Sequence, residues 1–205
     1  SFLYLCIVNR KKINMNKEIN NNGYDYVDLG LPSGTLWATC NVGSDKPSEY
    51  GLYFQWGDTK GYTKEQVGKD KQFTWNDYKF NLSGDGKPFT KYKIEAAKLD
   101  LEDDAVNYNM GGDWHMPTPT QIQELLDNTT TTWTTLDDVN GRLFTSKIEP
   151  SKFIFIPTAG GAWNGSVPSS GECGCVWSSQ SPAGYIGCGH YLIFYSGNAY
   201  LNFDN

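Results

Sequence analysis

The sequence predicts a single domain of the α+β class, in which two helices flank a small antiparallel sheet and long loops join the elements. Three observations indicate this class. Two helical patterns lie in the middle of the chain, short β-prone runs follow them, and 22 Gly residues supply turns. Aromatic residues make up 15% of the 205 residues, which favours a buried aromatic core over a disordered chain.

The N-terminal segment predicts no part of this core. Ser1–Val8 is apolar and the basic run Asn9–Lys12 follows it, which reverses the order of charge and apolar segment in a secretory signal. Met15 is an alternative start of the native chain. We therefore expect a flexible tail over residues 1–22 and a ligand-binding domain over residues 23–205.

The first half of the domain predicts strands and loops. Tyr24–Leu31 and Thr35–Thr39 are β-prone runs on either side of the turn Pro32-Ser33-Gly34, which predicts a hairpin. The aromatic run Tyr50–Trp56 predicts another strand, buried on one face. Residues 57–92 are rich in Gly, Lys and Asp, so we expect a long loop layer held down by its aromatic side chains.

Both helical patterns carry terminal signals. Leu101–Met110 has acidic residues in its first turn, which suits the helix dipole. The second helix has Thr118 as N-cap, Pro119 at the first helical position and Gln121 placed for a capping box. We expect this helix to end at Asn128-Thr129.

Short strands are predicted after the second helix, namely Arg142–Ser146, Phe153–Pro157, Cys175–Ser178, Tyr191–Tyr195 and Asn198–Phe203. Because side chains alternate between the two faces of a strand, the last two runs predict two sets of residues. The inward set is Leu192, Phe194, Leu201 and Phe203. The outward set is Tyr191, Ile193, Tyr195, Tyr200 and Asn202.

The last 25 residues have an unusual composition. The stretch Ser181–Asn205 lacks Lys, Glu, Gln, Met and Trp, although all five types occur earlier in the chain. It is rich in Tyr, Gly, Ser and Asn, the residues that dominate antibody-combining sites. Every residue type in the stretch can be encoded by a codon that ends in a pyrimidine. This composition predicts a recognition surface.

Several motifs together resemble the FISUMP-type (major paralogous) domains of gut-type bacteria and their phages. They are Val27–Ala38 (VDLGLPSGTLWA), Tyr50–Gly57 (YGLYFQWG), Asp103-Asp104-Ala105, Gly112–Thr118 (GDWHMPT) and Val176–Ser179 (VWSS). The resemblance implies a C-type lectin-like fold that binds a ligand or receptor. Some members are similar to the variable proteins of diversity-generating retroelements, in which mutagenesis of adenines rewrites codons near the C-terminus. Asn codons rewritten in this way give the residue types of Ser181–Asn205.

The chain departs from the family pattern at two places. His115 stands where the family usually has Arg, and the chain ends at Asn205, before a segment that usually closes the sheet. The resemblance therefore implies a shortened C-terminal end, with an unpaired sheet edge.

The expected function is non-enzymatic binding of a protein or carbohydrate ligand on a cell surface. The net charge of −6 argues against nucleic acid, and no apolar run is long enough to insert into a membrane. We expect the protein outside the cell, on a cell surface or a virion, and without a cofactor. The sequence does not indicate an oligomeric state. The expected binding residues are Trp163, Tyr185, Ile186, His190, Tyr191, Ile193, Tyr195, Tyr200 and Asn202.

Two other classes remain open. A bacterial surface adhesin or structural lectin-like module would share the fold but keep a fixed C-terminal sequence. A metal-dependent binding module would use Cys173, Cys175, Cys188 and His190, since three thiolates and an imidazole suit tetrahedral zinc. Their spacing matches no known zinc signature, and diversified codons explain the same residues.

Enzymatic and calcium-binding motifs are weakly represented. The sequence has no G-x-S-x-G elbow, Walker loop or H-E-x-x-H motif, which argues against an enzyme. Trp75-Asn76-Asp77 is similar to a calcium-lectin motif, but it lies far upstream of the final strands. The acidic residues Asp100, Glu102, Asp103 and Asp104 suit either a cation or, as we prefer, the start of a helix.

Overall fold

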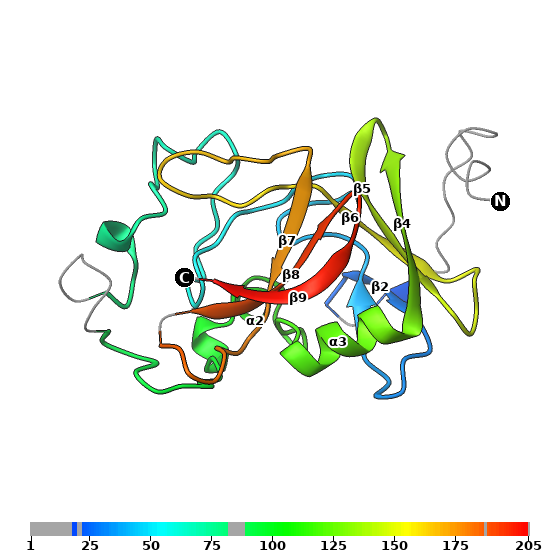
Figure 1. The fold of residues 1–205 in the computed structure, drawn as a ribbon, viewed down its shortest axis with the longest axis horizontal. Coiled ribbons are helices and arrows are strands. Elements are labelled where there is room, and N and C mark those ends of the chain that lie inside the picture. Colours follow the sequence, from blue (N-terminus) through cyan, green and yellow to red (C-terminus); the bar gives the residue numbers. More distant parts are fainter. Residues whose placement is uncertain (1–17, 20–21, 82–88, 187, 205) are drawn as a thin grey trace.

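The structure is a computed structural model that describes residues 18–19, 22–81, 89–186 and 188–204. Over these residues the chain is an α+β domain with few helices and three small antiparallel sheets of three strands each, which confirms the predicted class (Figure 1). No helix in the described ranges is long and apolar enough to cross a membrane.

The first sheet contains the predicted hairpin. It comprises β1 (Glu18–Ile19), β2 (Asp25–Asp28) and β3 (Leu36–Ala38), and Val27 of β2 lies opposite Trp37 of β3. Gly34 closes the turn by donating its N–H to the Leu31 carbonyl at 2.8 Å. Pairing of β1 with β2 places residues 18–19 in a sheet, so this part of the expected tail is structured; residues 1–17 and 20–21 lie outside the described ranges.

The second sheet follows the better-marked helix. Helix α3 (Pro119–Asn128) begins with the predicted capping box, in which Thr118 and Gln121 exchange hydrogen bonds of 3.2 and 2.9 Å. Strand β4 (Thr129–Leu136) starts directly at the helix end and was not predicted. It pairs with β5 (Val139–Ser146), which pairs in turn with β6 (Phe153–Pro157).

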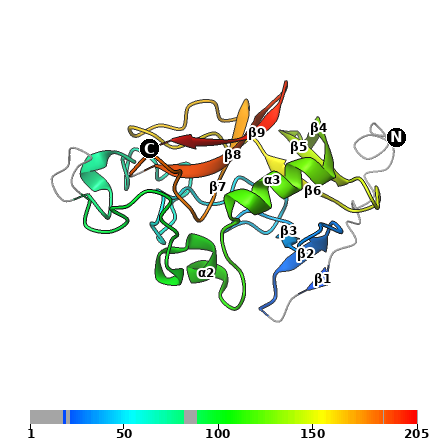
Figure 2. The same ribbon diagram turned by 60° about the horizontal axis from the view of Figure 1, so that its bottom comes forward.

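The third sheet comprises β7 (Cys173–Trp177), β8 (Gly189–Tyr195) and β9 (Ala199–Asp204). Figure 2 shows α3 running between this sheet and the first one. Side chains from α3 and from all three sheets share one apolar core, whose fully buried members include Ile122, Leu125, Phe144, Leu192 and Phe194. The third sheet is therefore fixed to the rest of the domain through one face.

The predicted strand over Tyr50–Trp56 is absent. Only Tyr53 makes a ladder contact in this run, an isolated bridge to Tyr62. The described residues 50–81 and 89–92 instead form the predicted loop layer, which contains the short 3-10 helix η1 (Trp75–Asp77). Separate aromatic clusters hold the layer in place, one around Phe73 and another around Tyr78.

The predicted helix over Leu101–Met110 is interrupted. A 3-10 turn, η2 (Leu101–Asp103), precedes α2 (Ala105–Met110), and Asp104 stands between them in an extended conformation. The Asp104 carboxylate accepts hydrogen bonds from the N–H groups of Val106 and Asn107, both at 2.9 Å. It is therefore the N-cap of α2, and a cap residue cannot be helical itself.

Candidate binding surface

Strand register gathers most of the predicted binding residues on one face of the third sheet, here called the outer face. Residues directly opposite each other on neighbouring strands point to the same side of a sheet. Pairing joins Trp177 to Tyr191 and Cys175 to Ile193 between β7 and β8. The same rule across all three strands gives an outer face of Cys173, Cys175, Trp177, Tyr191, Ile193, Tyr195, Tyr200 and Asn202.

Aromatic rings and one amide organise the outer face. Tyr195 and Tyr200 are 39% and 37% exposed, and their rings meet edge to face with centroids 6.2 Å apart. Trp177 and Tyr191 make a similar contact at 5.4 Å, and Asn202 donates to the Tyr191 hydroxyl at 3.2 Å. Rings held against each other lose little further rotamer freedom on binding, which suits an anchor in a binding site.

The phenol of Tyr200 is a neutral hydrogen-bonding group on the outer face. Desolvation, followed by the neighbouring Tyr195, raises the pKa of Tyr200 above its usual value. Its hydroxyl, like that of any tyrosine at neutral pH, is protonated and can both donate and accept hydrogen bonds.

The opposite, inner face of the sheet carries the core. Leu192 and Phe194 are fully buried, as predicted, and Leu201 packs against the same core. A Cβ atom at Gly174 would collide with the ring of Phe194, which explains the glycine between Cys173 and Cys175. This part of the expected alternation is confirmed.

Phe203 and His190 depart from the expected arrangement. Phe203 lies on the inner side of the sheet, as expected, yet it is 39% exposed, and its pairing partner His190 also lies on this side, opposite to Tyr191. Neither residue belongs to the main core, which does not extend to this end of the sheet. Phe203 stacks on Tyr185 at 4.8 Å, and the exposed Ile186 follows Tyr185. These residues form a second patch, separate from the outer face.

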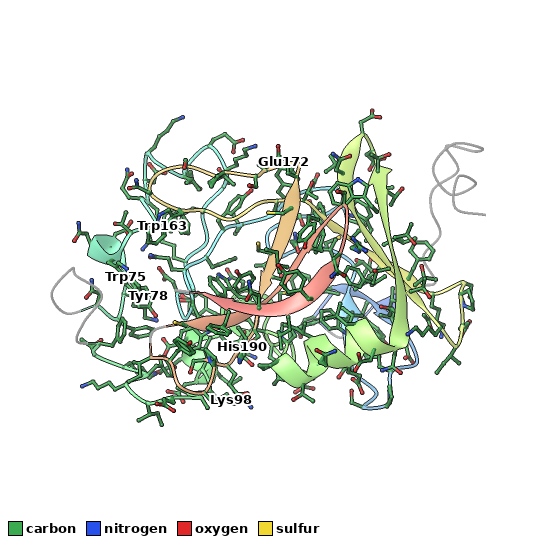
Figure 3. All side chains as sticks on the ribbon, viewed as in Figure 1. Trp75, Tyr78, Lys98, Trp163, Glu172 and His190 are labelled. Carbon is green, nitrogen blue, oxygen red and sulfur yellow. The ribbon has the colours of Figure 1, made fainter. Side chains whose placement is uncertain are left out.

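Trp163 lies apart from His190 (Figure 3), in a cavity wall to which the outer-face residues Cys175, Trp177 and Tyr191 also contribute. It stands in the loop between β6 and β7, where its N–H bonds the Ser166 carbonyl at 2.9 Å, and it is 49% exposed. Figure 3 shows Trp163 and His190 on separate parts of the molecule. Trp163 and Tyr191 line the same cavity, which His190 does not line.

A buried arginine fixes the turn that joins β8 to β9. Arg142 of β5 is 7% exposed, and its guanidinium donates to the carbonyls of Tyr195 at 2.6 Å and Asn198 at 3.3 Å. Desolvation lowers the pKa of Arg142. No local sequence pattern indicates this role, because the contact joins residues more than 50 positions apart. Cys173 and Trp177 were also absent from the expected binding residues. For these two a sequence signal existed, because side chains alternate along β7 and both share the face of Cys175.

The four residues considered for zinc do not converge. Cys175 pairs with Ile193, three positions along β8 from His190, which corresponds to roughly 10 Å. Cys188 is buried beside that end of the sheet, whereas Cys173 lies at the other end of β7. Burial raises the pKa of the Cys173 thiol, despite a hydrogen bond with Cys175 that lowers it. A thiol that resists ionisation is a poor metal ligand or nucleophile.

Two lysine side chains form ion pairs with the acidic cluster that the sequence suggested as a possible cation site. Lys91 Nζ lies 2.7 Å from Asp100 and 2.8 Å from Glu102, and it also pairs with the buried Asp103. Lys79 contributes a second ion pair to Asp103. These contacts raise the pKa of Lys91, and they lower the pKa of Asp103 against the opposing effect of burial. Lysines therefore pair with Asp100, Glu102 and Asp103, whereas Asp104 caps α2 and Glu102 and Asp103 lie in the first turn of η2, in agreement with the preferred interpretation of a helix start.

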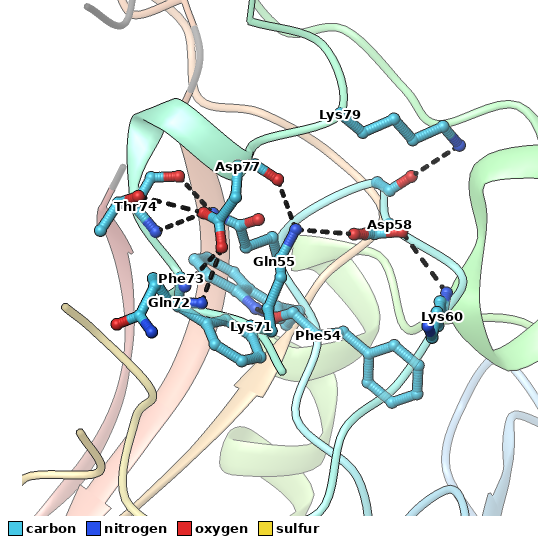
Figure 4. A network of polar contacts seen from close by, with 12 residues as sticks. Phe54, Gln55, Asp58, Lys60, Lys71, Gln72, Phe73, Thr74, Asp77 and Lys79 are labelled. Carbon is cyan, nitrogen blue, oxygen red and sulfur yellow. Dashed lines mark hydrogen bonds and ion pairs between the residues drawn. The ribbon is translucent and has the colours of Figure 1, made fainter. Parts of the chain in front are cut away.

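The lectin-like triplet Trp75-Asn76-Asp77 has a structural role instead. The Asp77 carboxylate accepts the N–H groups of Gln72 at 2.7 Å, Phe73 at 3.1 Å and Thr74 at 2.7 Å (Figure 4). The buried ammonium of Lys71 donates to the Asp77 carbonyl and lies 3.4 Å from the Asp58 carboxylate. All oxygens of Asp77 are thereby engaged in holding the loop layer.

Comparison with known proteins adds no relative. No protein-family model, no curated protein and no solved structure matches the chain.

Proposed function

We propose that the chain is a non-enzymatic binding protein whose outer face recognises a protein or carbohydrate ligand on a cell surface. The observation that carries the proposal is the set of half-exposed tyrosines on strands whose opposite face buries Leu192 and Phe194 in the core. Aromatic anchors at the centre of an interface supply most of its binding energy. A rigid sheet holds these anchors in place before the ligand arrives, which lowers the entropic cost of binding.

The proposal includes a C-type lectin-like fold and a place among the diversified proteins of retroelements in a phage or bacterium. The motif resemblance and the codon palette of Ser181–Asn205 support it. The division of β8 supports it further, because Tyr191, Ile193 and Tyr195 can change while Leu192 and Phe194 retain the core. The protein would act outside the cell, on a virion or a cell envelope.

A binding role is also consistent with the chemistry of the outer face. Its two thiols are partly buried, and burial raises the pKa of Cys173. Neutral phenols, thiols and an amide provide hydrogen bonds and contact area without an activated nucleophile.

Sequencing the same gene in near-identical genomes tests the diversified nature of this face. We expect adenine-directed substitutions at Tyr191, Ile193, Tyr195, Tyr200 and Asn202, and an adjacent template repeat with a reverse transcriptase. Substitutions should be absent at Leu192 and Phe194, because both are fully buried. An unchanging C-terminus would identify a fixed adhesin instead, and equal variation on both faces would refute the assignment.

A cell-adsorption assay tests the binding surface itself. The Tyr195→Ala/Tyr200→Ala double variant should adsorb to the bacterial cells that bind the original protein at least ~10-fold less well, since two aromatic anchors are lost. The matched control is Tyr108→Ala, because Tyr108 is 67% exposed and lies on α2, outside the strands that form the outer face. Equal adsorption by the double variant and the control would place the binding site elsewhere.

A further inference from the structure

A large cavity lies beside the outer face. It has a volume of about 1020 Å³ and is bounded by β3, the loop layer, the segment that follows β6, and the neighbouring strands β7 and β8. Six of the seven tryptophans of the chain line it: Trp37, Trp56, Trp75, Trp114, Trp163 and Trp177. Two of them, Trp75 and Trp163, lie on the same side of the molecule in Figure 3. Ligand pockets of proteins commonly reach this size and have this aromatic character.

The cavity wall carries almost no charge. Among the described residues that line it, none is Lys, Arg or Glu, and the acid Asp113 and the imidazole of His115 are both exposed. An ion that entered would lose its hydration without gaining a counter-charge, which is strongly unfavourable. The wall therefore selects for neutral ligands.

Three polar atoms of this wall lack a partner in the described part of the protein. They are the indole N–H groups of Trp37 and Trp114 and the side-chain oxygen of Gln55, all of them buried. Trp37 is 9% exposed, and Gln55 is held in place because its amide N–H donates to the Thr74 carbonyl at 3.0 Å. A buried donor without an acceptor costs roughly 1–3 kcal/mol, so a ligand that supplied partners to these groups would gain binding free energy.

We propose that this cavity binds a neutral, flat, largely apolar ring compound that carries a hydrogen-bond acceptor such as a ketone. The rings of the ligand would stack among the tryptophans, and its acceptor would receive a hydrogen bond from the indole N–H of Trp37. A hydroxyl group on a larger ligand would donate a hydrogen bond to the side-chain oxygen of Gln55. This site is additional to the outer face, with which it shares Trp177 and Tyr191.

Titration with Prodan, a neutral naphthalene ketone whose emission shifts to the blue in apolar surroundings, tests the proposal. We expect saturable binding of one Prodan per chain, with a blue shift and quenching of tryptophan emission by energy transfer. Anilinonaphthalene sulfonate has a similar ring system but carries a charge, so it should bind at least ~10-fold more weakly. Equal or tighter binding of the sulfonate would overturn the proposal.

Two variants locate the bound probe. Trp37→Phe keeps an aromatic ring but removes the N–H, and should weaken Prodan binding about 5- to 10-fold, the value of one hydrogen bond. Ala162→Phe should weaken it at least ~10-fold, because Ala162 lines the cavity and the added ring would occupy it. The matched control Ala183→Phe lies on an exposed turn outside the cavity and should bind Prodan as the original protein does.

The outcomes separate this site from the proposed binding face. Unchanged binding by Trp37→Phe overturns the proposal even if Ala162→Phe fails to fold. Loss of Prodan binding in Tyr195→Ala/Tyr200→Ala, with no loss in Trp37→Phe, would assign the probe to the outer face and also overturn the cavity site. Failure of cell adsorption, by contrast, bears only on the outer face.

Discussion

The sheet body and the loop layer of this domain are held together by different forces. The body, formed by α3 and strands β4 to β9, shares one apolar core that runs through all of its elements. The loop layer has several small aromatic clusters, and polar groups such as Asp77 and Lys71 join its segments. Burial of area stabilises the body at any pH, whereas the loop layer depends on particular charged partners.

Truncation of a core ring in the body should have the largest effect. Phe194 is fully buried and meets Phe144 edge to face at 6.1 Å, so Phe194→Ala should lower the free energy of unfolding by about 3–5 kcal/mol. Urea denaturation measures this loss. The neighbouring outer-face variant Tyr195→Ala is the control and should lose less than about 1 kcal/mol. Equal losses in the two variants would mean that the two faces of β8 are not distinct.

The contact between Arg142 and the turn is a polar interaction inside the otherwise apolar sheet body. It therefore tests how far the body depends on polar contacts, as the loop layer does. Arg142→Met should lower the free energy of unfolding by about 2 kcal/mol, since the Tyr195 carbonyl loses a charge-assisted hydrogen bond. Amide hydrogen exchange should accelerate at the turn between β8 and β9. The control is Lys152→Met, which removes a surface ion pair of 3.2 Å with Glu149 and should cost less than about 1 kcal/mol.

Acid should weaken the loop layer through Asp77. Burial alone would raise the pKa of Asp77, but hydrogen bonds from the N–H groups of Thr74 and Gln72, helped by Lys71, outweigh it and lower the pKa. The stabilisation by this carboxylate is therefore complete above the unfolded-state pKa of about 3.9 and is lost as the pH falls through the lower folded-state value.

The Asp77→Asn variant isolates this effect. It should lower the free energy of unfolding by about 1 kcal/mol at neutral pH, because the amide replaces one accepting oxygen with a donor, and the difference from the original protein should shrink in acid. Urea denaturation at neutral and acidic pH measures both quantities. Asp70→Asn, at an exposed position of the same layer, should cost nothing measurable. A pH-independent difference would exclude the proposed role of the carboxylate.

Substitution of an outer-face tyrosine alone should have the smallest effect on stability. Tyr200 is 37% exposed and lies outside the core, so Tyr200→Ser should change the free energy of unfolding by less than about 0.5 kcal/mol. Thermal unfolding measures the change, with Leu192→Ser as the buried comparison. A large loss in Tyr200→Ser would show that the outer face contributes to folding.

Local signals in the sequence predicted the elements that depend on local contacts. The capping box of Thr118 and Gln121 located α3, and the apolar run Phe153–Pro157 coincides with β6. The β-prone runs around Gly34 gave the first hairpin with its correct pairing. In each case the signal lies within the element or its turn: the cap residues Thr118 and Gln121 bond each other, and the hairpin strands are joined by one short turn.

The errors arose where distant contacts decide the outcome. Strand β4 was missed because Thr129 ends α3 and begins the strand, so no Gly or Pro marks the boundary. Asp104 interrupts the predicted helix because it also receives the N–H of Met116, 12 residues away. Phe203 follows the expected alternation but lies beyond the edge of the core, which periodicity alone does not reveal.

Arg142 donates its hydrogen bonds to carbonyl oxygens of the main chain, and every amino acid has such an oxygen. A library randomised at Tyr195 and Asn198 would therefore keep its turn geometry in nearly every member. Under the proposed function, substitutions at these positions would change ligand choice without changing folding yield, so new specificities could be sampled there without compensating changes elsewhere in the gene.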